Sequence, residues 1–192
     1  MSKPRNPIIV ALDVPHLESA LAMVAQLAPV VDAFKVGKEL FVAAGPEIVR
    51  RIRATGAAVF LDLKFHDIPN TVELAATRAG ALGVSFLTVH AYPQTMKAAR
   101  GALGSSPLKI LAVTVMTSYD DSDLAEAGYA LGVKDLVARR ARQAKDAGVH
   151  GLILSAEEAA DMRALLGPEM LLVTPGIRPA GGEVADQKRV MT

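Results

Sequence analysis

The sequence contains no cysteine, and aromatic residues make up only 4% of it. The absence of cysteine excludes disulfide bonds, thiolate catalysis and metal sites built on sulfur. An excess of one charge is also lacking, because 21 lysines and arginines are balanced by 20 aspartates and glutamates. This balance gives no electrostatic reason to expect a nucleic-acid partner.

Long apolar runs are also missing. No run approaches the roughly 18 residues of a membrane helix, and residues 1–7 lack the apolar stretch of a signal peptide. We therefore expect a cytoplasmic protein without a membrane partner. Hydrophobic residues, mainly alanine, valine and leucine, nevertheless make up 51% of the chain. Such a composition is typical of buried parallel strands covered by alanine-rich helices.

Apolar runs and helical spacing alternate along the chain. Strands are predicted at residues 8–12, 33–36, 59–63, 85–90, 109–116, 151–154 and 170–174. Helices are predicted at residues 15–28, 37–54, 71–79, 94–103, 134–147 and 156–166, and residues 117–132 form a long acidic connection. Regular alternation of this kind predicts an α/β fold of the TIM type, a (β/α)8 barrel with a parallel inner sheet.

The strand count stops at seven, whereas an eight-stranded barrel usually needs about 250 residues. We therefore expect residues 1–192 to form a single barrel domain that is incomplete at its C-terminus. The stretch after Pro175 contains Gly176, Pro179, Gly181 and Gly182, which predict a mobile polar loop.

Charged residues recur where the first three predicted strands end. Asp13 follows the first strand, Lys35 lies in the second, and Asp62 and Lys64 end the third. One such residue would be an ordinary solvated cap, but the carboxyl ends of parallel strands meet at one mouth of a barrel. Four charges brought together there must neutralise one another or a ligand.

The third strand continues into the most informative stretch, residues 60–71. Alternation along a strand places Asp62 and Lys64 on the same side. Asp67 follows three residues after Lys64, and Pro69 suits the first turn of a helix. Two carboxylates are therefore expected to bracket one ammonium. A structural ion pair is the alternative interpretation.

Residues 60–71 resemble the characteristic motif of the orotidine 5'-phosphate decarboxylase family, bacterial type. Its short D-x-K-x-x-D core also occurs in magnesium-dependent sugar-phosphate lyases and synthases, but the continuation Ile68-Pro69-Asn70-Thr71-Val72 favours the decarboxylases. The resemblance implies decarboxylation of orotidine 5'-phosphate to UMP, in pyrimidine biosynthesis, without a metal or cofactor. It also implies a homodimer.

The same resemblance assigns roles to individual residues. Lys64 corresponds to the proton donor, and Asp62, Asp67 and Lys35 to its charged catalytic partners, with Asp67 contributed by the partner subunit. Residues matching the family's substrate-binding positions are Asp13 and Lys35 at the ribose, Asp62, Thr71 from across the interface, Thr117 at the pyrimidine, and Arg178 and Gln187 in a lid over the phosphate.

The proposed reaction also agrees with charge placement. Loss of carbon dioxide from C6 of a pyrimidine leaves a carbanion in the ring plane, where the π system cannot delocalise it. The sequence contains no Gly-x-Gly-x-x-Gly motif and no Gly-Lys-Thr phosphate loop. A fixed cation able to deliver a proton, such as Lys64, is then the group that can help. Repulsion between Asp62 and the substrate carboxylate is a second contribution, of contested weight.

The four histidines give weaker signals. No pair of them has metal-ligand spacing, so no metal is expected. His66 is expected to serve packing or a dimer contact, and His90 is interpreted as a core residue rather than a catalyst. A non-catalytic fragment that binds nucleotide, or that only dimerises, remains a further alternative.

Overall fold

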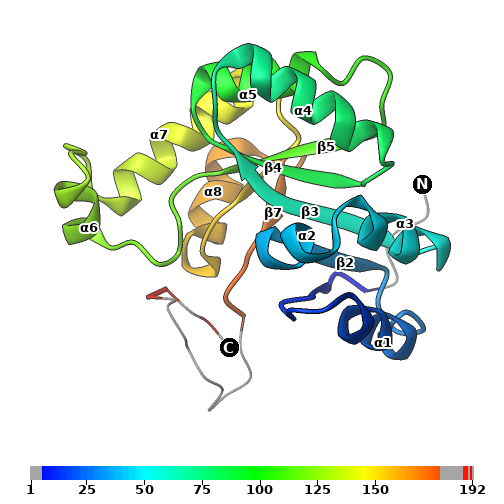
Figure 1. The fold of residues 1–192 in the computed structure, drawn as a ribbon. Coiled ribbons are helices and arrows are strands. Elements are labelled where there is room, and N and C mark those ends of the chain that lie inside the picture. The colour runs from blue at the N-terminus through cyan, green and yellow to red at the C-terminus, as the bar shows by residue number, and fades with distance from the viewer. Residues whose placement is uncertain (1–5, 178–187, 190, 192) are drawn as a thin grey trace.

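The computed structural model describes residues 6–177, 188, 189 and 191. Seven strands in this part of the chain form one parallel sheet whose spatial order is their sequence order (Figure 1). They are β1 (Ile9–Ala11), β2 (Ala33–Gly37), β3 (Ala58–Phe65), β4 (Phe86–His90), β5 (Lys109–Val113), β6 (Gly151–Ile153) and β7 (Leu171–Val173). The predicted parallel α/β barrel architecture is confirmed, with each predicted strand present.

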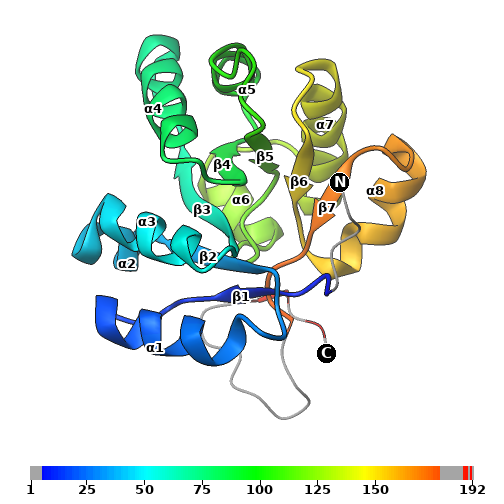
Figure 2. The same ribbon diagram turned by 90° about the vertical axis from the view of Figure 1, so that its right-hand side faces the viewer.

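Helices connect the strands. They are α1 (Leu17–Leu27), α2 (Lys38–Ala44), α3 (Pro46–Ala54), α4 (Pro69–Ala81), α5 (Pro93–Gly101), α6 (Asp121–Glu126), α7 (Val133–Asp146) and α8 (Ala159–Leu166), with a 3-10 turn η1 (Ala156–Glu158) before α8. All of them except α6, which is seen in the middle of the ring of strands, lie on the outer side of the curled sheet (Figure 2). None of the described helices is long and apolar enough to cross a membrane.

Two predicted connections differ from the structure. The single helix predicted over residues 37–54 is divided into α2 and α3, because Gly45 adopts a positive φ of 61° and Pro46 opens a new helix. The acidic connection contains α6, which begins at a capping box. There the Asp120 side chain accepts hydrogen bonds from the backbone N–H groups of Ser122 and Asp123.

Both faces of the sheet carry buried apolar side chains, and the site lies on one of these faces. Side chains such as Leu61 and Leu87 pack with the helices in the main core. A second apolar cluster contains Phe60, together with Phe86 and residues from the neighbouring strands, on the concave side. Because side chains alternate along a strand, Asp62 shares the side of Phe60, and Thr88 shares the side of Phe86. On the concave side, polar side chains therefore follow the apolar ones toward the carboxyl ends of the strands.

Candidate active site

A chain of alternating charges joins the first three strands. The Lys35 ammonium donates a hydrogen bond to Asp13 Oδ1 at 2.8 Å and lies 3.9 Å from Asp62 Oδ2. The Lys64 ammonium donates to the same Asp62 Oδ2 at 2.9 Å. The structure thus brings together the four charged residues that the sequence placed at one mouth of the barrel.

Burial differs along this chain of charges. The Asp62 side chain is 14% exposed, and those of Lys35 and Lys64 are 21% and 27% exposed, whereas Asp13 is 66% exposed. The Asp62 carboxylate is therefore largely removed from water, and the two ammonium groups offset the free-energy cost of burying its charge. Asp13 remains open to solvent, at the side from which a ligand would approach.

Lys64 has an unusual backbone. Its φ is 53°, and it is the non-glycine residue with positive φ in the described part of the chain. Such a conformation typically costs about 1–3 kcal/mol and persists where surrounding structure enforces it. The predicted contact between Asp62 and Lys64 is present. The strand is nevertheless irregular here, since its register with β4 shifts between Leu61 and Phe65.

Thr88, on β4, was not predicted as a site residue. It is fully buried, and its Oγ1 accepts the backbone N–H of Lys64 at 2.9 Å. The same hydroxyl donates to Asp62 Oδ1, also at 2.9 Å. The available sequence signal was weak: a threonine within an apolar strand, on the same side as Phe86.

Asp67 and Thr71 lie apart from this network. Both are exposed, and Asp67 Oδ1 accepts the N–H of Ile68 at 2.6 Å. Within the described residues no ion pair joins Asp67 to Lys64, whose carboxylate partner is Asp62. The chain itself therefore does not bracket the Lys64 ammonium with two carboxylates.

Thr117 follows β5 and is 8% exposed. Its carbonyl accepts the backbone N–H groups of Lys188 and Arg189 at 3.1 Å and 3.2 Å. The Lys188 ammonium also bonds Asp120 and Asp123, at 2.8 Å and 2.7 Å. Residues 188 and 189 therefore rest on the connection between β5 and α6. Hydrogen bonding from Lys188 holds the pKa of Asp120 well below its usual range.

Arg178 and Gln187, the expected phosphate ligands, lie outside the described residues.

An aromatic cluster lies at the ends of β3 and β4. The rings of His66 and Tyr92 stack with centroids 4.2 Å apart, and His66 Nδ1 is 3.0 Å from Thr95 Oγ1. The guanidinium of Arg140 lies over the rings of Tyr92 and Tyr129, 4.8 Å and 5.3 Å from their centroids. His66 therefore makes the packing contact that the sequence suggested.

His90 lies at the end of β4 and is 5.9 Å from His66, centroid to centroid. Burial is the main cause that lowers the His90 pKa from 6.5 to about 4. Neighbouring basic side chains lower the His90 pKa further; these are His66, Lys38, Arg140 and Lys64. His90 is therefore neutral at pH 7; it is partly buried, so its assignment as a core residue stays a prediction.

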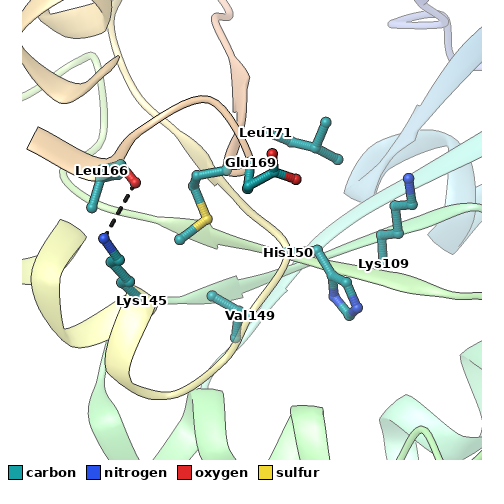
Figure 3. Close-up of a pocket in the computed structure, with 8 residues that line it drawn as sticks. Lys109, Lys145, Val149, His150, Leu166, Glu169 and Leu171 are labelled. Carbon is teal, nitrogen blue, oxygen red and sulfur yellow. Dashed lines mark hydrogen bonds between the residues drawn. The ribbon is translucent and has the colours of Figure 1, made fainter. Parts of the chain in front are cut away.

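A cavity of about 290 Å³ lies at the opposite ends of the strands (Figure 3). Lys109 and Leu171, which line it, begin β5 and β7. His150 precedes β6, and its Nδ1 accepts the N–H of Ile110 at 3.0 Å. The charge network at the other end of the barrel does not take part in this cavity: Asp13, Lys35, Asp62 and Lys64 are all absent from its lining. In the described part of the chain, no cluster of three or more histidines and acidic residues could hold a metal ion.

A parallel barrel whose strands carry ammonium and carboxylate groups to one mouth has the architecture of a (β/α)-barrel enzyme. The chain belongs to the orotidine 5'-phosphate decarboxylase / HUMPS family, whose sequence model matches residues 6–192.

Individual relatives agree with this assignment. The chain is 59% identical over 189 residues to an orotidine 5'-phosphate decarboxylase of Bradyrhizobium sp. strain BTAi1, covering 98% of this chain and 78% of the relative. It is also 59% identical over 188 residues to the enzyme of that name from Rhodopseudomonas palustris strain CGA009, covering 98% of this chain and 79% of the relative.

Two solved structures are similar as well. The crystal structure of orotidine 5'-phosphate decarboxylase from Lactobacillus acidophilus has a TM-score of 0.81 at 40% identity, covering 91% of this chain and 82% of that chain. An uncharacterized conserved protein from Geobacillus kaustophilus has a TM-score of 0.83 at 37% identity, covering 88% of this chain and 83% of that chain.

Proposed function

We propose that this protein decarboxylates orotidine 5'-phosphate to UMP, in pyrimidine biosynthesis, without a metal or an organic cofactor. The observation that carries the proposal is the Lys64 ammonium, held 2.9 Å from Asp62 Oδ2 at the barrel mouth of a member of this family. The substrate is that of the relatives named above. We also propose that the described strands belong to one domain and that the protein is cytoplasmic.

The chemistry needs a fixed positive charge beside C6. As the bond between C6 and the carboxylate breaks, its electron pair stays on C6 and carbon dioxide leaves. An N–H bond of the Lys64 ammonium then breaks, its proton goes to C6, and the neutral amine regains a proton from solvent. Asp62 holds the ammonium in position before the reaction, so little reorganisation is needed as charge develops.

Substrate binding is assigned to groups around this centre. Asp13 and Lys35 hold the ribose hydroxyls, and this role is supported by the exposure of the Asp13 carboxylate, 66%, beside the Lys35 ammonium. Thr117 contacts the pyrimidine edge. Arg178 and Gln187 bind the phosphate, for which a guanidinium offers charge-assisted hydrogen bonds.

The exposed face around Asp67 supports a homodimer in which each subunit completes the site of the other. Ile68 and Leu74 are large apolar residues that are 67% and 58% exposed, and Asp67 has no ion pair to Lys64 in its own chain. In the proposed dimer, Asp67 approaches the partner's charge network, and Thr71 reaches its ribose. Burial of the apolar side chains would stabilise the contact.

The dimer can be tested by complementation. Lys64→Ala and Asp67→Ala, each inactive alone, should recover partial activity when mixed, because one of the two sites in a mixed dimer has both residues intact. Subunit exchange is verified by mass spectrometry of differently tagged chains. No recovery after complete exchange would show that Asp67 serves its own chain.

The reaction is tested with Lys64→Ala, assayed by loss of orotidine 5'-phosphate absorbance and by titration with UMP. Turnover should disappear while UMP affinity stays within about tenfold, because the ammonium acts on a carbanion that the product lacks. Lys134→Ala removes an 87% exposed lysine and serves as the matched control. Equal losses of affinity and rate would contradict the proton-donor role.

A chelator separates this reaction from the magnesium-dependent sugar-phosphate chemistry that shares the short motif. Turnover of orotidine 5'-phosphate should be unchanged in excess EDTA. Loss of turnover that returns with added magnesium would support the sugar-phosphate enzymes instead.

A further inference from the structure

We infer that Thr88 is a positioning residue that orients both the Asp62 carboxylate and the backbone of Lys64. This inference rests on the proposed decarboxylation, because it concerns how the proton donor is held. Thr88 is fully buried, so it acts through the two charged residues and not by touching substrate.

The first part of the inference comes from strand pairing. Leu61 pairs with Leu87 and Phe65 pairs with Val89, so β3 advances four residues while β4 advances two. Thr88 is the β4 residue that faces this irregular segment. A regular ladder would offer a carbonyl to the Lys64 N–H, and here the Thr88 hydroxyl accepts it at 2.9 Å. The hydroxyl thereby stabilises the positive φ of Lys64, which directs its side chain.

The second part of the inference comes from the different partners of the two Asp62 carboxylate oxygens. Oδ1 accepts the Thr88 hydroxyl at 2.9 Å, while Oδ2 faces the ammonium groups of Lys64 at 2.9 Å and Lys35 at 3.9 Å. Occupation of Oδ1 by a neutral donor fixes the rotation of the carboxylate. The second oxygen is then held where the two cations can share it.

The two hydrogen bonds also have a defined direction. The Lys64 N–H donates to Oγ1, so the hydroxyl proton remains available for Asp62 Oδ1. The backbone amide, the hydroxyl and the carboxylate thus form a chain of two hydrogen bonds, and in such a chain each hydrogen bond polarises the next. One hydroxyl thus links the backbone that carries the proton donor to the carboxylate that binds the donor's ammonium group.

The test compares Thr88→Val, which removes the hydroxyl, with Thr88→Ser, which retains it. In Thr88→Val, kcat for orotidine 5'-phosphate should fall about 10- to 100-fold, the range associated with misplacement of a reacting group. KM and UMP affinity should stay within about threefold, because the charges that bind ligand remain. Thr88→Ser should restore kcat to within about threefold of the wild type. Thr88→Cys, of similar volume with a weak S–H donor, replaces the valine variant if that variant does not fold.

Thr114→Val is the matched control. Thr114 is also fully buried, and its hydroxyl donates to the Ile153 carbonyl at 3.1 Å, outside the charge network. This variant should lower the melting temperature while leaving kcat within about twofold of the wild type, since it removes a buried hydrogen bond of ordinary strength. A Thr88→Val enzyme that is merely less stable, with unchanged kcat, would overturn the inference.

Hydrogen exchange gives a readout that does not depend on activity. The Lys64 amide should exchange at least tenfold faster in Thr88→Val than in the wild type, while the Leu61 amide is unchanged. If the wild type does not turn over orotidine 5'-phosphate, the proposed function fails, and this measurement still decides whether Thr88 holds Lys64. Equal Lys64 exchange in both proteins would refute the positioning role.

Discussion

The positive φ of Lys64 predicts that glycine at this position gives a more stable protein than alanine. Lys64→Ala and Lys64→Gly both remove the ammonium and its 2.9 Å contact with Asp62, so that loss cancels in the comparison. The variants differ in the Cβ atom, which is unfavourable at a φ of 53°. The comparison therefore isolates the backbone strain at the proposed proton donor.

The magnitude follows from two opposing effects. Removal of Cβ from a left-handed residue relieves about 1–2 kcal/mol, whereas the greater freedom of glycine in the unfolded chain costs about 0.4–1 kcal/mol. The mid-range values leave a net gain of about 0.8 kcal/mol, which corresponds to a melting temperature about 1.5–3 °C higher for a protein of this size.

The assay is a thermal melt of both variants, supported by urea unfolding. Ala58→Gly is the control, since Ala58 lies on the same strand without a positive φ. It should lower stability by about 0.5–1 kcal/mol, the usual effect of glycine in a strand. If Lys64→Gly melts at or below the temperature of Lys64→Ala, the backbone at Lys64 is not strained and the reasoning fails.

Two further predictions concern stability. The protein should lose stability as the pH falls from 6.5 toward 4, because the unfolded chain protonates His90 there while the folded chain, with its His90 pKa lowered to about 4, does not. Melts across this range should be flatter for His90→Asn, and an unchanged slope would exclude His90 as the cause. Gly151→Ala should cost about 1–3 kcal/mol by overpacking, because the new Cβ would lie 2.6 Å from the Leu171 carbonyl oxygen. Gly101→Ala, whose Cβ meets no atom within 4 Å in helix α5, should not destabilise and should raise stability by about 0.4–1 kcal/mol in the same melts.

Most of the fold could be predicted because its determinants are local. Each strand is a short apolar run and each helix has apolar residues at helical spacing, so their alternation is visible without tertiary information. The break between α2 and α3 was missed, although Gly45-Pro46 is a recognised breaker pair. The helix α6 was missed because it is short, although Asp120 and Asp123 have the spacing of a capping box.

The site could be predicted only in part. Asp13, Lys35, Asp62 and Lys64 were placed together because parallel strands bring their carboxyl ends to one mouth. The left-handed backbone of Lys64 and the role of Thr88 depend on the register between β3 and β4, which the spacing of one strand does not encode. The position of Asp67 illustrates the same limit, since spacing suggested a bracket around Lys64 that its own chain does not form.

The sequential order of the strands has a consequence for how the protein folds. Every strand pairs with its neighbour in sequence, so each pairing closes over one helical connection and not over a larger part of the chain. The polar partners in the site also come from consecutive strands. Lys35 is 22 residues from Asp13, and the Thr88 hydroxyl is 26 residues from Asp62. If strands dock in chain order, Asp13 meets the Lys35 ammonium when β2 arrives, and Asp62 arrives on β3 together with Lys64 and also approaches Lys35. Assembly in that order pairs each carboxylate with an ammonium as it becomes enclosed, which avoids the cost of burying a lone charge.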